Sequence, residues 1–245
     1  MRRMTYDSNF EQAPTAIVTG ASRGFGAAVA RLLAEDGWRL VVDARHPDRL
    51  ADTVAALGPR CVGIAGDVTD AEHRHALIDA AAATGGLDLL VNNASELGPS
   101  PLQRITELDS DVLARIFAVN VIAPAALVAS ALPLLAARRG AIVDVTSDAA
   151  VEGYPGWGGY GASKAALEQA DRVLVTELAE DDTDVRVWTL DPGDMRTDMH
   201  QAAFPGEDIS DRADPRSVAP VVPRLVATRP PSGRIRAAEL LVASP

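Results

Sequence analysis

The chain has 245 residues, 47% of them hydrophobic and 23% charged, so it can bury a large core as one α/β domain or as two small ones. Its formal net charge of -11 argues against nucleic acid or an anionic membrane as a partner, because both are polyanionic. The single cysteine, Cys61, excludes an internal disulfide and a Cys-x-x-Cys pair. We interpret Cys61 as a small buried side chain.

Residues 1–13 predict a flexible, polar N-terminal arm that carries Asp7 and Glu11. The arm lacks the apolar stretch of a signal peptide, and no segment has the roughly 18 uninterrupted apolar residues of a membrane span. These features predict a cytoplasmic protein.

Short apolar runs then alternate with longer amphipathic stretches, a pattern typical of repeated β-α units. The predicted strands are residues 16–19, 40–43, 61–65, 87–91, 141–146, 185–190 and 235–240, and the predicted helices are residues 24–36, 48–57, 71–84, 108–138, 160–180 and 217–227. Several strands are apolar throughout, as a parallel sheet covered on both faces requires. We therefore expect one Rossmann-type domain over residues 14–245, a three-layer α/β/α structure with a doubly wound, seven-stranded parallel sheet.

The first predicted strand runs directly into a glycine-rich turn and then a helix. The turn contains Thr19, Gly20, Ser22, Gly24 and Gly26 in the pattern T-G-x-x-x-G-x-G. Glycines allow a tight turn and close approach of a pyrophosphate, and the helix N-terminus supplies N–H groups and positive dipole character. This context predicts a dinucleotide-binding turn.

The T-G-x-x-x-G-x-G spacing resembles the short-chain dehydrogenase/reductase family, and the resemblance extends from residue 15 to residue 240. Further motifs of this kind occur in the order expected for the family: Asp67-Val68, Asn92-Asn93-Ala94, Asn120, Ser147, Tyr160-Gly161-Ala162-Ser163-Lys164, Pro192-Gly193 and Thr197. One departure is Ser95, which stands where the family more often has glycine after Asn-Asn-Ala. We expect it to cause only a local adjustment of the backbone.

The resemblance implies a bound nicotinamide dinucleotide. It places Asp67 and Val68 at the adenine, Asn93 at the ribose and Thr197 at the nicotinamide carboxamide. The full set expected to contact the cofactor is Gly20, Ser22, Arg23, Gly24, Phe25, Gly26, Arg45, Asp67, Val68, Asn93, Ala94, Tyr160, Lys164, Pro192, Gly193 and Thr197.

The end of the second strand bears on the choice between NAD(H) and NADP(H). A carboxylate there hydrogen-bonds a free ribose 2′-hydroxyl, whereas arginine accommodates a 2′-phosphate. The family's acidic position falls at Ala44, and Arg45 and Arg23 are placed to reach a phosphate. NADP(H) is therefore favoured, although a shift of one residue would bring the Asp43 carboxylate to the ribose and favour NAD(H).

Tyr160 and Lys164 are four residues apart on a predicted helix and so share one face. Reduction of a carbonyl needs a proton donor, but the ordinary tyrosine pKa of about 10 is poorly matched to neutral pH. An ammonium group and the positive nicotinamide of the oxidised cofactor should stabilise phenolate and lower this pKa. The pair predicts acid–base catalysis by Tyr160.

Two further residues complete the predicted catalytic set. Ser147 follows the fifth strand, at the edge where open α/β sheets bind ligands, and should hydrogen-bond the substrate oxygen. Asn120 lies in a long helix whose Pro124 has no N–H to donate to the Asn120 carbonyl. By the resemblance, the helix opens there and holds a water linked to Lys164. Asp148 departs from the small or apolar residue expected next to Ser147, and it either meets a basic or polyhydroxylated substrate or faces solvent.

Substrate choice should depend on two flexible segments. Tyr154 and Trp157 lie in a glycine-rich run just before Tyr160 and are expected to line the pocket, although Trp157 could instead pack at a subunit contact. Residues 194–214 predict a lid, with Met195 and Met199 among those facing the substrate. His73 and His75 point to different faces of a helix and form no metal pair.

These features predict an NAD(P)-dependent oxidoreductase that transfers a hydride between nicotinamide and a small carbonyl or secondary alcohol. One alternative is a dinucleotide-binding sensor or scaffold without turnover, which the intact catalytic set argues against. Another is an epimerase or dehydratase, but the chain is short for their larger substrate domain. The resemblance implies a homodimer or homotetramer, with apolar faces on the helices predicted at 108–138 and 160–180.

Overall fold

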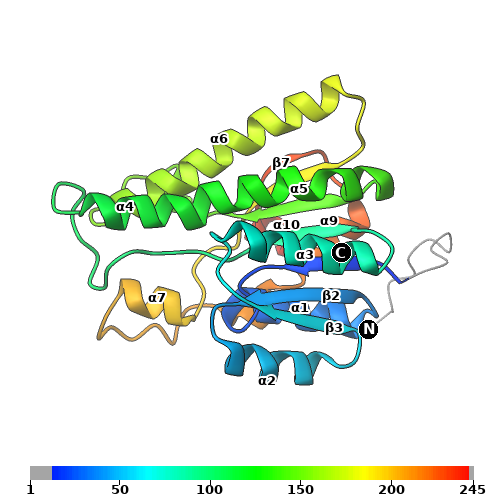
Figure 1. The fold of residues 1–245 in the computed structure, drawn as a ribbon. Coiled ribbons are helices and arrows are strands. Elements are labelled where there is room, and N and C mark those ends of the chain that lie inside the picture. Colours follow the sequence, from blue (N-terminus) through cyan, green and yellow to red (C-terminus); the bar gives the residue numbers. More distant parts are fainter. Residues whose placement is uncertain (1–12, 243–245) are drawn as a thin grey trace.

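A computed structural model describes residues 13–242, so the predicted N-terminal arm lies outside the described residues apart from its last position. Its centre is a parallel seven-stranded sheet in the order β3-β2-β1-β4-β5-β6-β7 (Figure 1). The strands are β1 (Thr15–Val18), β2 (Arg39–Ala44), β3 (Cys61–Ala65), β4 (Leu89–Asn92), β5 (Ala141–Val145), β6 (Arg186–Asp191) and β7 (Gly233–Arg236). The order reverses between β1 and β4, which defines the doubly wound topology and confirms the predicted fold class.

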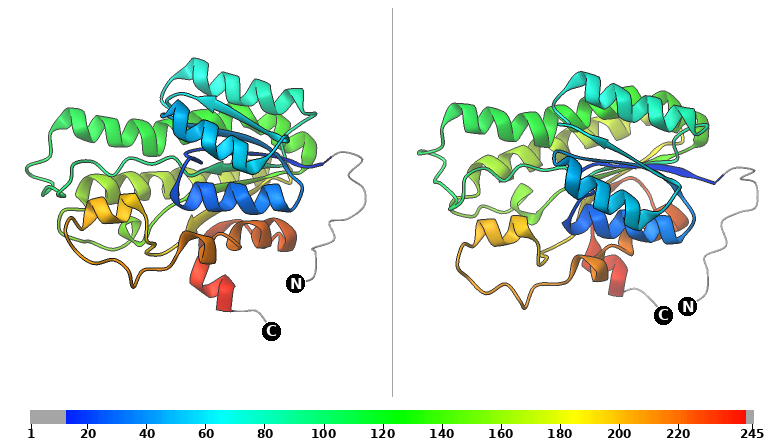
Figure 2. Two further views of the ribbon diagram at one scale, coloured as in Figure 1. Left: turned by 90° about the horizontal axis from the view of Figure 1, so that it is seen from below. Right: turned by 60° about the horizontal axis from the view of Figure 1, so that its bottom comes forward.

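Helices cover both faces of the sheet because its central strands are apolar on both sides. Ala16 and Val18 of β1 pack into the cluster formed with α1, α2, α8, α9 and α10, whereas Ile17 packs into the cluster formed with α3, α5 and α6. Figure 2 shows the resulting three layers from two further directions. The helices are α1 (Gly24–Glu35), α2 (Pro47–Leu57), α3 (Ala71–Ala83), α4 (Ser110–Phe117), α5 (Ala123–Arg138), α6 (Gly158–Glu180), α7 (Asp198–Ala203), α8 (Pro215–Val218), α9 (Val221–Thr228) and α10 (Ala237–Val242).

The predicted long helix over residues 108–138 begins at Ser110 and is interrupted by a π turn, Ala118–Ile122. The N–H of Ala123 donates to the carbonyl of Ala118, five residues back, and Pro124 follows with no N–H to donate. The helix therefore opens around Asn120, as the family resemblance implies. By length and composition Ser110–Arg138 could cross a membrane, but Leu127, Ala131 and Leu135 of this helix pack in the core against the sheet.

Two predictions near the C-terminus were partly wrong. The strand predicted over 235–240 ends at Arg236, and the chain continues as α10, whose Ala237 is buried against the neighbouring core. The helix predicted over 217–227 is divided into α8 and α9. Short apolar runs in this region are compatible with a helix as well as with a strand. Over so few residues, hydrophobic periodicity does not distinguish the two.

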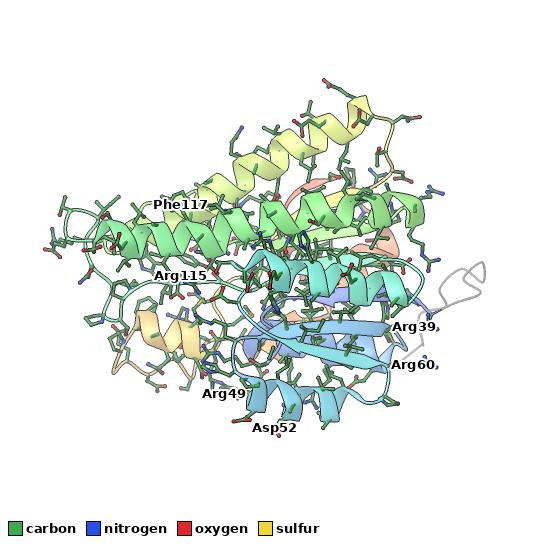
Figure 3. The ribbon with its side chains drawn as sticks, in the orientation of Figure 1. Arg39, Arg49, Asp52, Arg60, Arg115 and Phe117 are labelled. Atoms are coloured by element: carbon green, nitrogen blue, oxygen red, sulfur yellow. The ribbon has the colours of Figure 1, made fainter. Side chains whose placement is uncertain are left out.

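All strands run in the same direction, so their carboxyl ends meet at one edge of the sheet. In Figure 3, Arg39 and Arg60 mark the amino ends of β2 and β3, and α7 lies at the opposite end of the molecule. The loops after β1, β2, β4, β5 and β6 converge on that carboxyl edge, where open α/β sheets bind ligands.

Candidate active site

A cavity of about 980 Å³ occupies the carboxyl edge of the sheet and runs from the glycine-rich turn to the start of α6. It brings together nearly all of the residues predicted for the cofactor and the substrate. The predicted residues that line it are Gly20, Ser22, Arg23, Gly24, Phe25, Arg45, Asp67, Val68, Asn93, Ala94, Ser147, Tyr154, Trp157, Tyr160, Lys164, Pro192, Gly193, Met195, Thr197 and Met199. Gly26 and Asn120 are not among the lining residues.

The glycine-rich turn adopts a conformation that side chains would disturb. Gly20 has a φ of +64°, and a Cβ there would lie 2.9 Å from the Cα of Ala94. A Cβ on Gly26 would overlap the Asn93 amide and lie 2.8 Å from the Gly20 carbonyl oxygen. Gly26 therefore allows α1 to pack against the turn and is not among the residues that line the cavity; its contact with the cofactor stays a prediction.

Asn93 holds this turn in place. Its Nδ2 donates to the carbonyl oxygens of Thr19 and Gly20 at 2.9 and 3.1 Å, and its backbone N–H donates to Thr19 Oγ1 at 2.9 Å. The β4 loop is thus fastened to the β1 loop at the point where the strand order reverses.

Asp43 is buried beneath the turn. One carboxylate oxygen accepts a hydrogen bond from the Gly20 N–H at 2.6 Å, and the other lies 3.0 Å from Nε2 of His73. Both oxygens are occupied inside the protein and the side chain is only 2% exposed. The shift of register that would present this carboxylate to a ribose does not occur.

Arginines line the adjoining part of the cavity. Arg23 donates to Asp198 of α7 at 2.7 Å, and Arg45 lies 3.5 Å from Glu96; both arginine side chains are about half exposed. Further along, Arg115 of α4, labelled in Figure 3, donates to Asp67 at 2.6 Å. Burial opposes the shift, but hydrogen bonds from Thr69 and Arg115 lower the pKa of Asp67 to about 2.

Tyr160 and Lys164 lie on one face of α6 and are both buried at the inner end of the cavity. Lys164 Nζ lies 5.6 Å from the centre of the Tyr160 ring and donates to the Val145 carbonyl at 2.7 Å. Burial raises the pKa of Tyr160 above its ordinary value, and the charges of Asp191 and Asp148 add to this, whereas hydrogen bonding with Ser95 and Ser147 lowers it. The chain's own residues therefore hold Tyr160 as a phenol. The lowered pKa expected from the sequence includes the charge of the oxidised nicotinamide and stays a prediction.

Lys164 has a pKa lowered to about 8, chiefly because burial disfavours its charged form. Two carboxyl groups, Asp144 and Asp171, oppose this shift. Asp144 accepts a hydrogen bond from Asn92 at 2.6 Å, and Asp171 accepts one from Thr189 at 2.8 Å.

Asp144 and Asp171 are also hydrogen-bonded to each other in the interior. Burial raises the pKa of both groups, and mutual repulsion raises that of Asp171 further, to about 10. Two buried carboxylates in contact cannot both ionise, so the pair holds one proton near neutral pH and faces Lys164 with a single negative charge.

Asn120 links two elements of the site by hydrogen bonds. Its Oδ1 accepts hydrogen bonds from Ser95 Oγ at 3.1 Å and from the Glu96 N–H at 2.7 Å. Its Nδ2 donates to the Glu96 carbonyl at 2.8 Å and to Ser163 Oγ at 2.9 Å. The fully buried Asn120 side chain therefore joins the β4 loop to α6, the helix that carries Tyr160.

Ser147 and Asp148 lie just after β5, beside Tyr160. Ser147 Oγ donates to Asp148 Oδ1 at 2.8 Å, and Asp148 Oδ2 accepts a hydrogen bond from the Tyr154 hydroxyl at 2.9 Å. The Ala149 N–H also donates to Asp148 Oδ1, at 2.8 Å. Asp148 therefore lines the cavity as a direct neighbour of Ser147, with a side chain partly open to solvent.

Aromatic and apolar side chains form the outer wall of this part of the cavity. The Trp157 ring meets the Tyr160 ring edge-on at 5.6 Å and lies 6.1 Å from the Phe204 ring. Met199 of α7 packs against the same cluster. Trp157 thus packs within this chain, and α7 falls in the segment predicted as a lid.

Some site residues were not found from the sequence. Ser95, which departs from the family's more usual glycine, bonds Asn120 and influences Tyr160. Arg234 of β7 reaches Glu168 at 3.0 Å, Asp191 at 3.0 Å and the Ser147 carbonyl at 3.2 Å, so it supports the strand end that carries Ser147. Ser95 could have been found as the departure from glycine in the Asn-Asn-Ala motif. No sequence motif marks Arg234, because its partners are distant in sequence.

The fold and the cavity define a dinucleotide-binding α/β protein with a Tyr–Lys pair beside the binding turn. The family model described as short chain dehydrogenase matches residues 14–208. The chain belongs to this family, and it is an oxidoreductase acting on CH–OH or C=O groups with NAD(P).

Individual relatives extend over most of the chain. The human mitochondrial dehydrogenase/reductase SDR family member 2 is 37% identical over 199 residues, 79% of this chain and 69% of that protein. A serine 3-dehydrogenase of Agrobacterium fabrum is 33% identical, over 76% of this chain and 73% of that protein. A short chain dehydrogenase of Shigella flexneri, solved in complex with NADP, aligns with a TM-score of 0.85 and 27% identity, over 93% of this chain and 98% of that one.

Proposed function

We propose that the protein is an NADPH-preferring enzyme that interconverts a small carbonyl compound and its secondary alcohol, with Tyr160 as the acid–base group. One observation carries the proposal: the buried Tyr160 phenol, next to Ser147 and Lys164, faces the same cavity that begins at the dinucleotide-binding turn. The residues fit a dinucleotide because one cavity runs from the glycine-rich turn, where Gly20 and Gly24 have positive φ, to Tyr160 and Lys164. Hydride transfer is the chemistry that a bound nicotinamide supplies.

The chain's own residues manage the proton. Tyr160, held as a phenol by burial, donates its proton to the substrate oxygen during reduction, and Ser147 hydrogen-bonds the same oxygen. Lys164, whose pKa of about 8 lies near neutrality, can return a proton towards Tyr160. Asn120 positions these groups by joining the β4 loop to α6.

NADPH preference is supported by the charges near the turn. Arg23 and Arg45 line the cavity in ion pairs that a 2′-phosphate can replace, and the Asp43 carboxylate is used internally by Gly20 and His73. The serine 3-dehydrogenase among the relatives and the NADP complex among the structural neighbours agree in class with this proposal.

Activity is tested by following NADPH and NADH oxidation against a broad panel of ketones and aldehydes. We expect turnover mainly with NADPH. Tyr160→Phe should lower kcat at least about 100-fold while NADPH affinity is retained, because only the proton donor is lost. Unchanged turnover in this variant contradicts the catalytic assignment, and tight cofactor binding with no turnover of any carbonyl favours the sensor function.

Cofactor preference is tested with Arg45→Ala and Arg23→Ala. Loss of one charge-assisted contact costs about 1.5–3 kcal/mol, so the Kd for NADPH should rise roughly 10- to 100-fold, with little change for NADH. Arg49→Ala is the matched control, because Arg49 is exposed on α2 near Arg45 but does not line the cavity (Figure 3). Equal losses of affinity for NADPH and NADH in the arginine variants contradict the proposed preference for NADPH.

A cytoplasmic location and a homo-oligomeric state stay predictions. Ile122 on the π turn and Val173 on α6 are 62% and 46% exposed, which supports pairing of subunits through these helices. Mass measurement of the native protein in solution tests the oligomeric state.

A further inference from the structure

Asp148 stands out in the substrate part of the cavity because its carboxylate engages the hydroxyl that should bind the substrate. Ser147 has a single hydroxyl proton, which is donated to Asp148 Oδ1 at 2.8 Å, so Asp148 competes for this proton with the Tyr160 oxygen. To hydrogen-bond a substrate carbonyl, Ser147 must turn this proton away from a carboxylate. Asp148 therefore opposes the binding of a neutral carbonyl at the position where reduction takes place.

The Asp148 carboxylate accepts several hydrogen bonds but has no counter-ion among the described residues. Ser147, Ala149 and Tyr154 all donate to it. Within residues 13–242, the salt bridges include none to Asp148. Glu152 and Asp194 add further negative charge nearby. Together with Asp148 they raise the pKa of the Tyr154 phenol.

This combination discriminates between kinds of substrate. Three of the roughly four acceptor sites of the carboxylate are in use, so a sugar-like hydroxyl could add at most one hydrogen bond, in place of one to water and with little net gain. A cationic group would gain from the unpaired charge and could rest against the neighbouring aromatic side chains Tyr154 and Trp157. It would also weaken the hold of Asp148 on the Ser147 proton.

We propose that Asp148 is a specificity-determining residue that recognises an ammonium group on the substrate, so that the enzyme acts on amino ketones and amino alcohols. This inference rests on the proposed function of the cavity. A substrate oxygen bonded to Ser147 lies no more than about 5.6 Å from Asp148 Oδ1, two hydrogen-bond lengths away. The nitrogen should therefore lie within two to four bonds of the carbonyl carbon.

Two ketones of the same shape test the proposal: 1-(dimethylamino)propan-2-one, assayed at pH 6.5 where it is protonated, and 4-methylpentan-2-one, its uncharged counterpart. For the wild type, kcat/KM with NADPH should be at least tenfold higher for the cationic ketone. Since the ammonium also makes its carbonyl more reactive, the decisive quantity is the change in this ratio on mutation. Asp148→Asn should lower the ratio at least tenfold, largely by reducing kcat/KM for the cationic ketone. An unchanged ratio overturns the proposal.

Glu152→Gln is the matched control, because Glu152 is an exposed carboxylate in the same loop that does not line the cavity. Its ratio should stay within twofold of the wild type. An equal fall of the kcat/KM ratio in Asp148→Asn and Glu152→Gln would indicate general attraction of the cation by surface charge. It would also overturn the assignment to Asp148.

A binding measurement separates this inference from the proposed function. The two corresponding alcohols, 1-(dimethylamino)propan-2-ol and 4-methylpentan-2-ol, are titrated by calorimetry into the enzyme saturated with NADPH, where no reaction occurs. Tighter binding of the cationic alcohol, lost in Asp148→Asn, supports the inference even if neither ketone is reduced and the proposed reaction fails. Equal binding of both alcohols to the wild type contradicts it whether or not the ketones react.

Discussion

Replacing Asp171 with asparagine should remove a proton site without removing a hydrogen-bond partner. In the folded protein Asp144 and Asp171 share one proton, and Thr189 donates to Asp171. An asparagine amide can donate to Asp144 and accept from Thr189, as the protonated acid does. The variant therefore keeps the single negative charge of the pair and loses only the titration.

The sign of the effect follows from proton binding. In the unfolded chain an aspartate loses its proton near its ordinary pKa of about 3.9, whereas the folded pair retains one proton to a much higher pH because the pKa of Asp171 is raised. The folded state binds more protons, so the free energy of unfolding falls as the pH rises above 4. The limiting slope is about 1.4 kcal/mol per pH unit.

Relative to Asp171→Asn, the wild type should lose up to about 2.7 kcal/mol of unfolding free energy between pH 5 and pH 7. Groups common to both proteins cancel in this difference. Urea unfolding followed by tryptophan fluorescence at pH 5, 6, 7 and 8 measures it. Asp181→Asn, an exposed aspartate at the end of the same helix, is the control and should show a constant difference. A difference for Asp171→Asn that does not change with pH would refute the shared proton.

Two further variants test the surroundings of the site. Ser95→Gly removes a hydrogen bond that lowers the pKa of Tyr160, so the pH for half-maximal alcohol oxidation should move up by about 0.4–1 unit; an unchanged pH–rate profile would show that Ser95 does not act on Tyr160. Gly26→Ala places a methyl group against Asn93 and the Gly20 carbonyl and should destabilise the protein by about 1–3 kcal/mol, seen as a lower Tm and weaker NADPH binding. Gly153→Ala, where no atom of the described residues lies within 4 Å of the added carbon, should leave both unchanged; similar losses in the two variants would contradict this steric reasoning.

The order of strands and helices was predictable because it depends on local patterns. Apolar runs such as Cys61–Ala65 were predicted to the residue. The missing N–H of Pro124 indicated a free carbonyl at Asn120, and the family resemblance implied that the long helix opens there. Both features depend on only a few neighbouring residues. The short helices α7 and α10 were missed because segments of six residues carry too little periodic signal.

The sequence by itself determined the family, the glycine-rich turn and the spacing of Tyr160 and Lys164, since these depend on residues close together along the chain. Only the tertiary structure decided how the charged groups pair. It turned Asp43 inward to Gly20 and His73, joined Asp144 to Asp171 beneath Lys164, and placed Asp148 on Ser147. Pairing of this kind depends on distances and burial in three dimensions, which set whether a carboxyl group is a ligand, a support or a proton carrier.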